Sequence, residues 1–288
     1  GVLDDVKGAI GVNRHLPIHG DVGVETGNLE FNGSLSIKGT VTTGYTVIAT
    51  GDISIEGAEG VSGAKLIKSI EGDVYIRGGI FGLGSTLVEA GGNIFVKHVN
   101  EAILVADDSI HIGFYSLGSQ LTAHSIFVDE RRGKIIGGRA VAKNTIVTAI
   151  SGNRLERRTD LIIESVNKQE SYAMMQDKAT QLKQLQSDIS EREAKITSLL
   201  PLLKQMSTQQ IAAFEETKQS LSKLKAEAVT LDREIKLMMD EMRHAGKEEI
   251  IVTKEAYPGT YIQIGKKSSL LNKMTNGKFL LEFGELNV

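Results

Sequence analysis

The chain has 288 residues, which is enough for two ordinary domains with a sizeable core. Charged residues make up 24% of it and the formal net charge is -3, so it lacks the clustered basic charge with which nucleic-acid-binding proteins contact phosphates. It contains no cysteine, which excludes disulfides and thiolate metal ligands and fits a reducing cytoplasm.

Glycine divides the chain into three parts. Of its 31 glycines, 26 precede residue 153, none lies between 153 and 245, and five follow. This distribution predicts a turn-rich part, a continuous helical part and a short turn-rich tail. No apolar run approaches the roughly 18–20 residues that span a bilayer. The sequence begins with Gly1 rather than Met, so we expect it to be a piece of a longer protein.

Residues 1–27 are expected to be irregular, because Pro17 and several glycines would break a helix. The segment 20–24 (GDVGV) is read either as a degenerate first coil of the repeat that follows or as an N-terminal arm leading into it.

Residues 28–165 repeat one short phrase, in which a glycine or polar turn precedes an apolar-x-apolar triplet. Gly51-Asp52-Ile53-Ser54-Ile55 is one clear copy. The first apolar positions are 35, 53, 74, 94, 110, 126 and 146, so successive steps are 18, 21, 20, 16, 16 and 20 residues. A phrase recurring at this period predicts a parallel β-helix, or solenoid, in which the two apolar residues of each triplet point inward.

Two further residue types mark the repeat. Alanine stands three or four residues before the first apolar position in five copies, at Ala49, Ala90, Ala106, Ala123 and Ala142. We expect these small side chains to fit where the chain turns inward over its neighbour. The residue directly before each strand, such as Asp52, Asp73 or Asn93, is a turn former that we expect to bond its own backbone.

Residues 166–245 change to a helical period, with apolar residues recurring at alternating steps of three and four. The seam positions of the two halves are 175, 178, 182, 185, 189, 192, 196, 199, 203 and 206, and 214, 217, 221, 224, 228, 231, 235, 238, 242 and 245. Together with a break near 201–210, they predict a long antiparallel coiled-coil hairpin inserted in the β region. Ser207 is a candidate N-cap for the returning helix.

The expected tip of this hairpin is apolar. Its members include Leu199, Leu203, Met206, Ile211 and Phe214. An apolar tip on a projecting arm is a candidate contact site for a partner protein, although the same residues could merely hold the two helices together.

Residues 246–288 return to strand patterns around the turn signal Tyr257-Pro258-Gly259. We expect this tail to pack back on the solenoid and cap its last coil, so that the chain is mainly β with an α insertion.

No spacing points to a catalytic, cofactor or metal site. His98, His111 and His124 lie 13 residues apart, which is not the coil period, so we do not expect them to stack into a metal site. The glycine-rich run 78–84 lacks the Gly-Lys-Ser/Thr ending of a phosphate loop. Tryptophan is absent and the other aromatic residues look scattered, which disfavours a polysaccharide-binding groove.

Several phrases, in a fixed order, resemble the flagellar assembly protein A family. They are 20–22 (GDV), 26–33 (TGNLEFNG), 37–41 (IKGTV), 49–57 (ATGDISIEG), 134–138 (KIIGG) and 257–260 (YPGT). The resemblance covers nearly the whole chain. It implies a cytoplasmic bacterial protein with a right-handed β-helix, a helical insertion and a further domain upstream, which acts in flagellar assembly or placement through protein contacts. It supplies no catalytic motif.

We therefore predict a non-enzymatic scaffold without a cofactor, whose partners are proteins of the flagellar or polar-localisation machinery, with self-association left open. Two alternatives remain. One is a cytoskeletal polymer that joins end to end as bactofilin-like β-helices do. The other is an enzyme, for which a polysaccharide lyase fits better than a left-handed acyltransferase, because the latter needs a six-residue period and steps varying from 16 to 21 residues do not keep to one.

Overall fold

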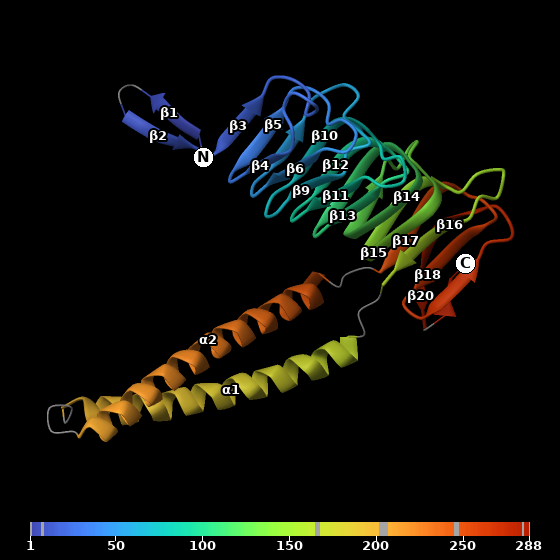
Figure 1. The fold of residues 1–288 in the computed structure, drawn as a ribbon. Helices are drawn as coiled ribbons and strands as arrows, with labels where there is room; N and C mark the ends of the chain where they lie inside the picture. Colours follow the sequence, from blue (N-terminus) through green and yellow to red (C-terminus); the bar gives the residue numbers. More distant parts are fainter. Residues whose placement is uncertain are drawn as a thin grey trace. The chain divides into compact units, whose positions relative to one another are not determined.

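The structure, a computed structural model, describes residues 2–6, 9–164, 168–201, 207–244, 248–283 and 285–287. The chain forms two compact units, Gly1–Ser165 with Lys247–Val288, and Val166–Gly246. The first unit is a β-solenoid and the second contains two helices (Figure 1).

The described strands of the first unit are β1 Val2–Val6, β2 Ala9–Asn13, β3 His15–Ile18, β4 Leu29–Phe31, β5 Ser34–Ile37, β6 Thr46–Ala49, β7 Ile53–Ile55, β8 Val61–Ser62, β9 Leu66–Ser69, β10 Val74–Phe81, β11 Leu87–Ala90, β12 Ile94–Asn100, β13 Ile103–Ala106, β14 Ser109–Val128, β15 Lys134–Ser151, β16 Thr159–Ile163, β17 Glu249–Ala256, β18 Thr260–Ile264, β19 Lys267–Leu270, β20 Thr275–Glu282 and β21 Glu285–Leu286. β1 and β2 pair with each other in antiparallel fashion.

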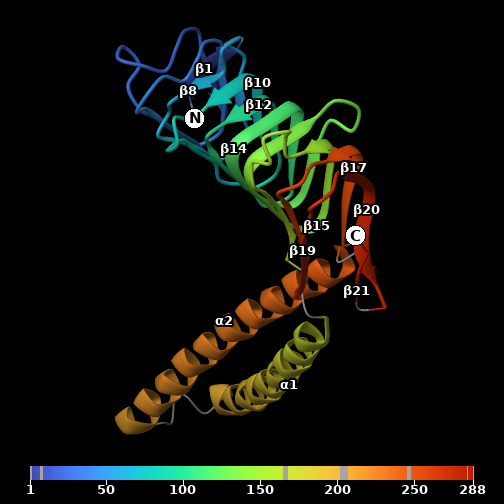
Figure 2. The same cartoon turned by 90° about the vertical axis from the view of Figure 1, so that its right-hand side faces the viewer.

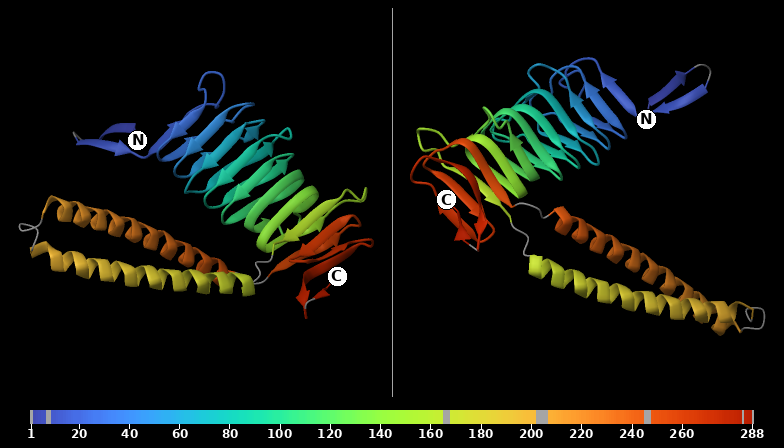
Figure 3. Two further views of the ribbon diagram at one scale, coloured as in Figure 1. Left: turned by 60° about the horizontal axis from the view of Figure 1, so that its bottom comes forward. Right: turned by 180° about the vertical axis from the view of Figure 1, so that it is seen from behind.

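From β3 onward the chain winds through about eight turns of a parallel solenoid (Figures 1 and 3). The strand segments lie on three faces, although on face B the first turns are linked only by isolated bridges at Val22 and Val41. Face A consists of β3, β5, β7, the starts of β10 and β12, and segments of β14, β15 and β17. Face B contains β8 and later segments of β10, β12, β14 and β15. Face C contains β4, β6, β9, β11, β13, segments of β14 and β15, β16 and β18.

The apolar triplets form the core of face A, which confirms the predicted solenoid. Leu35 pairs with Ile53, Ile53 with Val74, and Val74 with Ile94, each one coil further along the chain. All four side chains are at most 1% exposed. Burial of a side chain of this size contributes about 1.5–3 kcal/mol, so stacking the coils is the main source of stability.

The predicted alanines line face C. Ala49, Ala90 and Ala106 are each at most 5% exposed, and Ser69 takes the same place in the intervening coil. Ala123 pairs with Ala142 further along the same line of inward positions. The small residues lie at the ends of the face C segments, where the chain approaches the next corner.

The turn formers before face A bond the next coil rather than their own turn, which corrects the expectation from the sequence. Ser34 Oγ accepts from the backbone N–H of Asp52, and Asp52 Oδ1 accepts from that of Asp73, at 3.1 and 2.9 Å. Asp73 Oδ1 in turn accepts from the Asn93 N–H, and Asn93 Oδ1 from that of Ser109, at 2.7 and 3.1 Å. A line of side-chain acceptors therefore links five consecutive coils.

The same geometry explains why glycine precedes these residues. A Cβ built on Gly72 would lie 2.4 Å from Asp52 Oδ1, and one on Gly92 would lie 2.3 Å from Asp73 Oδ1. Each acceptor lies over the glycine of the following coil, so a side chain there would displace the carboxylate from its hydrogen bond.

The stack ends in antiparallel strands. β17 and β18 continue the parallel faces, but β20 pairs with β17 and β19 with β18 in the opposite direction (Figure 2). Leu271 and Phe279 from this segment belong to the core and are 4% and 2% exposed. The parallel pairing thus stops at β17 and β18.

The second unit contains α1, Lys168–Leu199, and α2, Thr208–His244. Every predicted seam position whose burial is described is buried or half-buried. Three cross-helix contacts join them: Lys178 to Glu234 at 2.6 Å, Arg192 to Ser220 at 2.5 Å, and Glu193 to Lys225 at 2.7 Å. Lys178, early in α1, thus meets Glu234, late in α2.

Ser207 caps α2, as the sequence predicts. Its hydroxyl accepts from the Gln210 N–H at 3.4 Å, and the Gln210 side chain accepts from the Ser207 N–H at 2.8 Å. This reciprocal pair satisfies two backbone donors at the helix start.

We predict that Asp73→Ala lowers the unfolding free energy by about 1–2 kcal/mol, because the Asn93 N–H loses its acceptor. Asp73→Asn retains an acceptor oxygen and should cost less. Urea titration at pH 7 measures both changes. Asp107→Asn is the control, since this exposed side chain makes no hydrogen bond with the described residues.

The Asp73 comparison also has a pH dependence. Burial raises the pKa of Asp73, but hydrogen bonds from Asn93 and Tyr75 outweigh it and hold the pKa below its usual range. The stabilisation from the ionised carboxylate is therefore present above the unfolded pKa of about 4 and is lost as the pH falls through the folded pKa. The stability advantage of the wild type over Asp73→Asn should shrink on acidification; growth of that advantage would contradict the assignment.

We further predict that Gly92→Ala costs about 1–3 kcal/mol through overpacking, whereas Gly20→Ala, whose Cβ would meet nothing within 4 Å, costs far less. Combining Gly92→Ala with Asp73→Ala should cost less than the sum of the single changes, because the second removes the obstructing carboxylate. Additive costs in thermal or urea unfolding would show that the two residues do not interact.

Candidate functional site

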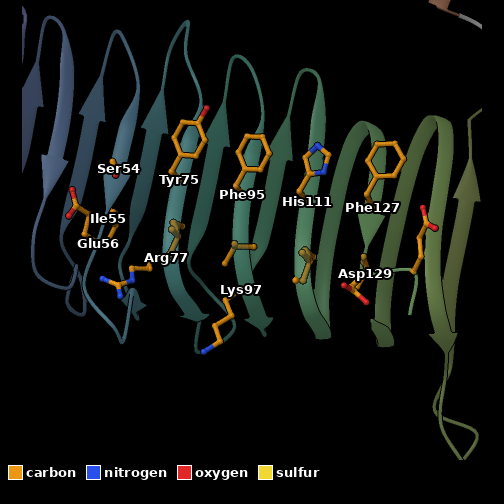
Figure 4. Close-up of a pocket in the computed structure, with 16 residues that line it drawn as sticks. Ser54, Ile55, Glu56, Tyr75, Arg77, Phe95, Lys97, His111, Phe127 and Asp129 are labelled. Carbon is orange, nitrogen blue, oxygen red and sulfur yellow. The ribbon is translucent and has the colours of Figure 1, made fainter. Parts of the chain in front are cut away.

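An aromatic ladder runs along the outside of face A. Tyr75, Phe95, His111 and Phe127 occupy the outward middle position of four consecutive coils (Figure 4). Their ring centroids are separated by 4.9, 4.8 and 5.2 Å, with interplanar angles of 2°, 7° and 18°. The distances match the spacing of hydrogen-bonded strands, so the backbone register itself places each ring on the next.

Hydrogen bonding fixes the first ring of the ladder. The Tyr75 hydroxyl donates to Asp73 Oδ2 at 2.7 Å, and this bond to a carboxylate raises the pKa of Tyr75 to about 12. Asp73 thus binds both the backbone of the next coil, at Asn93, and the first ring of the ladder, Tyr75.

Burial keeps the third ring uncharged. His111 lies between Phe95 and Phe127, and its partial burial lowers its pKa below the usual value. At neutral pH the ladder is therefore an uncharged aromatic strip.

A groove of about 610 Å³ follows the ladder across five coils. Its second side consists of the residues two positions further along the chain in each coil. They are Glu56, Arg77, Lys97 and Asp129, labelled in Figure 4, and Gly113. Gly113 contributes no side chain to this row, so the row is interrupted beside His111. The groove lies along the solenoid axis and across the strands.

The charged residues along the groove differ in whether other residues of the chain already bind them. Glu56 meets Lys38 at 2.5 Å and Ser36 at 3.1 Å, and these hydrogen bonds lower its pKa. Asp129 accepts from the backbone N–H groups of Arg131 and Arg132, which lower its pKa. Arg77 and Lys97 are exposed and form no ion pair with any described residue.

The expectation of scattered aromatic residues is therefore wrong. Tyr75, Phe95, His111 and Phe127 all occupy the middle position of the repeated triplet, and this common phase was the signal that could have revealed the ladder. Because the loops at the corners differ in length, the number of residues between successive rings varies. A search for a constant spacing therefore does not find the ladder.

A second, shorter aromatic group lies on face B. His98 stacks on Tyr115 at 5.2 Å and meets Phe81 edge-on at 5.3 Å. His98 and His111 thus belong to different faces. Within the described parts of the chain, no group of three or more His, Cys, Asp or Glu side chains could hold a metal ion.

The predicted contact residues of the helical unit differ in exposure. Leu199 is half-buried, Ile211 is 42% exposed, and Phe214 is only 6% exposed, so its ring is covered. Leu203 and Met206 lie outside the described residues. Leu200, next to Leu199, is 51% exposed. The large exposed apolar side chains described near this end are thus Leu200 and Ile211.

The glycine-rich segments prove to be structural. Gly78, Gly79 and Gly82 belong to β10 or directly follow it, and a Cβ at Gly79 would strike the His98 ring. Gly137 and Gly138 adopt positive φ angles of 66° and 78°, and Arg157 lies over Gly137. In the described chain no helix is both long and apolar enough to cross a membrane.

Of the comparisons with known proteins, the one with family models agrees with the fold. Searches against curated proteins and against solved structures find no match. The family model of the flagellar assembly protein A β-solenoid domain matches residues 14–286, which takes in the described solenoid from β3 to β21 as well as the helical unit. The chain therefore belongs to the flagellar assembly protein A β-solenoid domain family.

Proposed function

We propose that this chain is a non-enzymatic, cytoplasmic scaffold of flagellar assembly or placement that binds other proteins through its helical unit. The observation that carries the proposal is the insertion itself: residues 166–246 form a separate compact unit between β16 and β17 of one solenoid. A segment that is not needed to complete the coils is free to serve a partner.

We infer that α1 and α2 form an antiparallel coiled-coil hairpin. Position 178, early in α1, pairs with 234, late in α2, whereas 192 and 193, late in α1, pair with 220 and 225, which lie nearer the start of α2. The burial of Phe214 and Leu221 on the predicted seam supports the same arrangement.

We also propose that the solenoid is right-handed. Connections between parallel strands of one sheet are right-handed in about 98% of cases, for reasons of strand twist. An end-to-end polymer receives less support, because the antiparallel strands β19 and β20 end the parallel stacking at the C-terminal side.

Cysteine cross-linking tests the hairpin. In this chain without native cysteine, Lys178→Cys with Glu234→Cys should be joined readily by a short bismaleimide, because the wild-type side chains meet at 2.6 Å. Lys178→Cys with Lys218→Cys is the control, since position 218 lies more than four helical turns from 234 along α2. Equal cross-linking of both pairs would contradict the antiparallel arrangement.

Removal of the helical unit tests the division of labour. Replacing residues 168–244 with a short Gly-Ser linker should leave a folded β protein by circular dichroism that no longer retains flagellar or polar proteins from a lysate of a flagellated bacterium. Retention of the same proteins by the shortened chain, or loss of its fold, would overturn the proposal.

Point substitutions in the full chain test, by the same lysate retention measurement, whether the exposed apolar residues form the contact. Leu200→Ser with Ile211→Ser should reduce retention at least tenfold, whereas Val229→Ser with Leu237→Ser, which alter side chains 70% and 56% exposed on the shaft of α2, should not. Equal effects of the two pairs would place the contact elsewhere on the helices.

A further inference from the structure

The face A groove has the features of a second binding site, on the solenoid rather than on the helices. We propose that it binds an acidic, apolar segment of a partner protein, with carboxylates beside Arg77 and Lys97 and apolar side chains along the aromatic ladder. This inference rests on the proposed function as a protein-binding scaffold and gives it a second, chemically defined contact.

Size restricts the ligand. The groove spans the rungs of residues 54, 75, 95, 111 and 127, which are four intervals of about 4.8 Å and so extend for about 19 Å. An extended chain covers this length with about six residues. A short linear segment therefore fills the groove.

The ladder geometry favours a peptide over a glycan or nucleic acid. Sugars and bases bind aromatic side chains through the ring faces, but the facing rings of Tyr75, Phe95, His111 and Phe127 already stack on one another. The groove therefore offers a ligand the two outer faces at the ends of the stack, on Tyr75 and Phe127, and along its length only the outward ring edges. These edges carry the positive part of the aromatic quadrupole and suit aliphatic side chains and acceptor oxygens.

Charge fixes the sign and the orientation of the ligand. Arg77 and Lys97 are the second and third members of the row of five, are exposed, and have no ion-pair partner among the described residues. Glu56, the first member, is already hydrogen-bonded by Lys38 and Ser36, and the charge of Arg77 also lowers its pKa. The Lys97 ammonium lies 5.6 Å from the centre of the Phe114 ring. Asp129 and Glu130 line the opposite end of the groove. Carboxylates of the ligand are thus attracted to Arg77 and Lys97 and repelled from Asp129 and Glu130, where neutral or basic side chains fit.

Gly113 provides a means of closing the groove without damaging the fold. Its φ is not in the left-handed region, and the nearest atom to an added Cβ is the Lys97 carbonyl oxygen at 3.6 Å, an ordinary contact distance. A longer side chain at this position would fill the gap in the second row beside His111.

A random dodecapeptide library displayed on phage, selected on the full chain, tests the proposal. Enriched peptides should combine acidic and apolar residues, with the acids gathered toward one end. Synthetic copies should bind at least tenfold more weakly to Arg77→Glu with Lys97→Glu and to Gly113→Gln, while the wild-type affinity falls with added salt. Circular dichroism checks that each variant is folded.

Lys254→Glu with Lys266→Glu is the matched control, because it makes the same change in net charge at exposed positions outside the groove. This pair should bind the peptides as the wild type does. Peptides that bind all variants equally, a failure to enrich acidic peptides, or an equal loss with the control pair would each overturn the proposal.

Two competitors separate the other ligand classes. If an oligogalacturonate or a single-stranded oligothymidylate binds with the same dependence on Arg77 and Lys97 and the peptides do not, the groove is a polyanion site and the proposal is wrong. Concentration-dependent self-association that the Arg77→Glu, Lys97→Glu pair abolishes would assign the groove to a second copy and overturn it as well. None of these outcomes affects the lysate test of the helical unit, so the two proposals fail independently.

Discussion

The in-register stacking of one coil on the next is the constraint on which the rest of the structure depends. The inward residues of face A, such as Ile53 and Val74, are buried from solvent only because the neighbouring coil is stacked in register with their own. The same register brings Asp73 Oδ1 to the Asn93 N–H and stacks Tyr75 on Phe95. Core, hydrogen-bonded corner and outer ladder are thus three results of one spacing.

Much of the fold followed from local patterns because the physics is local and repeated. A triplet such as Ile53-Ser54-Ile55 alternates inward and outward residues whatever lies elsewhere, and the seam from Met175 to Met238 reports helix burial through spacing alone. Ser207 was identifiable as a cap for the same reason, since its partner Gln210 is three residues away.

The candidate site was harder to predict because its residues meet only across coils. Tyr75 and Phe95 are 20 residues apart, whereas Phe95 and His111 are 16 apart, so no constant period reveals the ladder. Asp73 was expected to bond its own turn, but its Oδ1 accepts a hydrogen bond from the Asn93 N–H of the next coil. Likewise, the apolar character of Phe214 suggested a contact surface, while its place on the seam covers it. In each case the residue type was informative, but the sequence did not show which neighbouring coil or helix the side chain contacts.

The glycine and the acceptor that follows it give each coil two complementary parts. The glycine accommodates a side chain from the coil before, and the acceptor bonds the coil after, as Gly92 and Asn93 do between Asp73 and Ser109. A coil defined in this way is a self-contained module. If a whole coil were removed, the acceptor of the coil before it would still lie over the glycine of the coil after it. If only part of a coil were removed, that acceptor would instead lie over a residue with a side chain. The solenoid is therefore suited to change its length in steps of complete coils, and with it the number of rings that its outer face can carry.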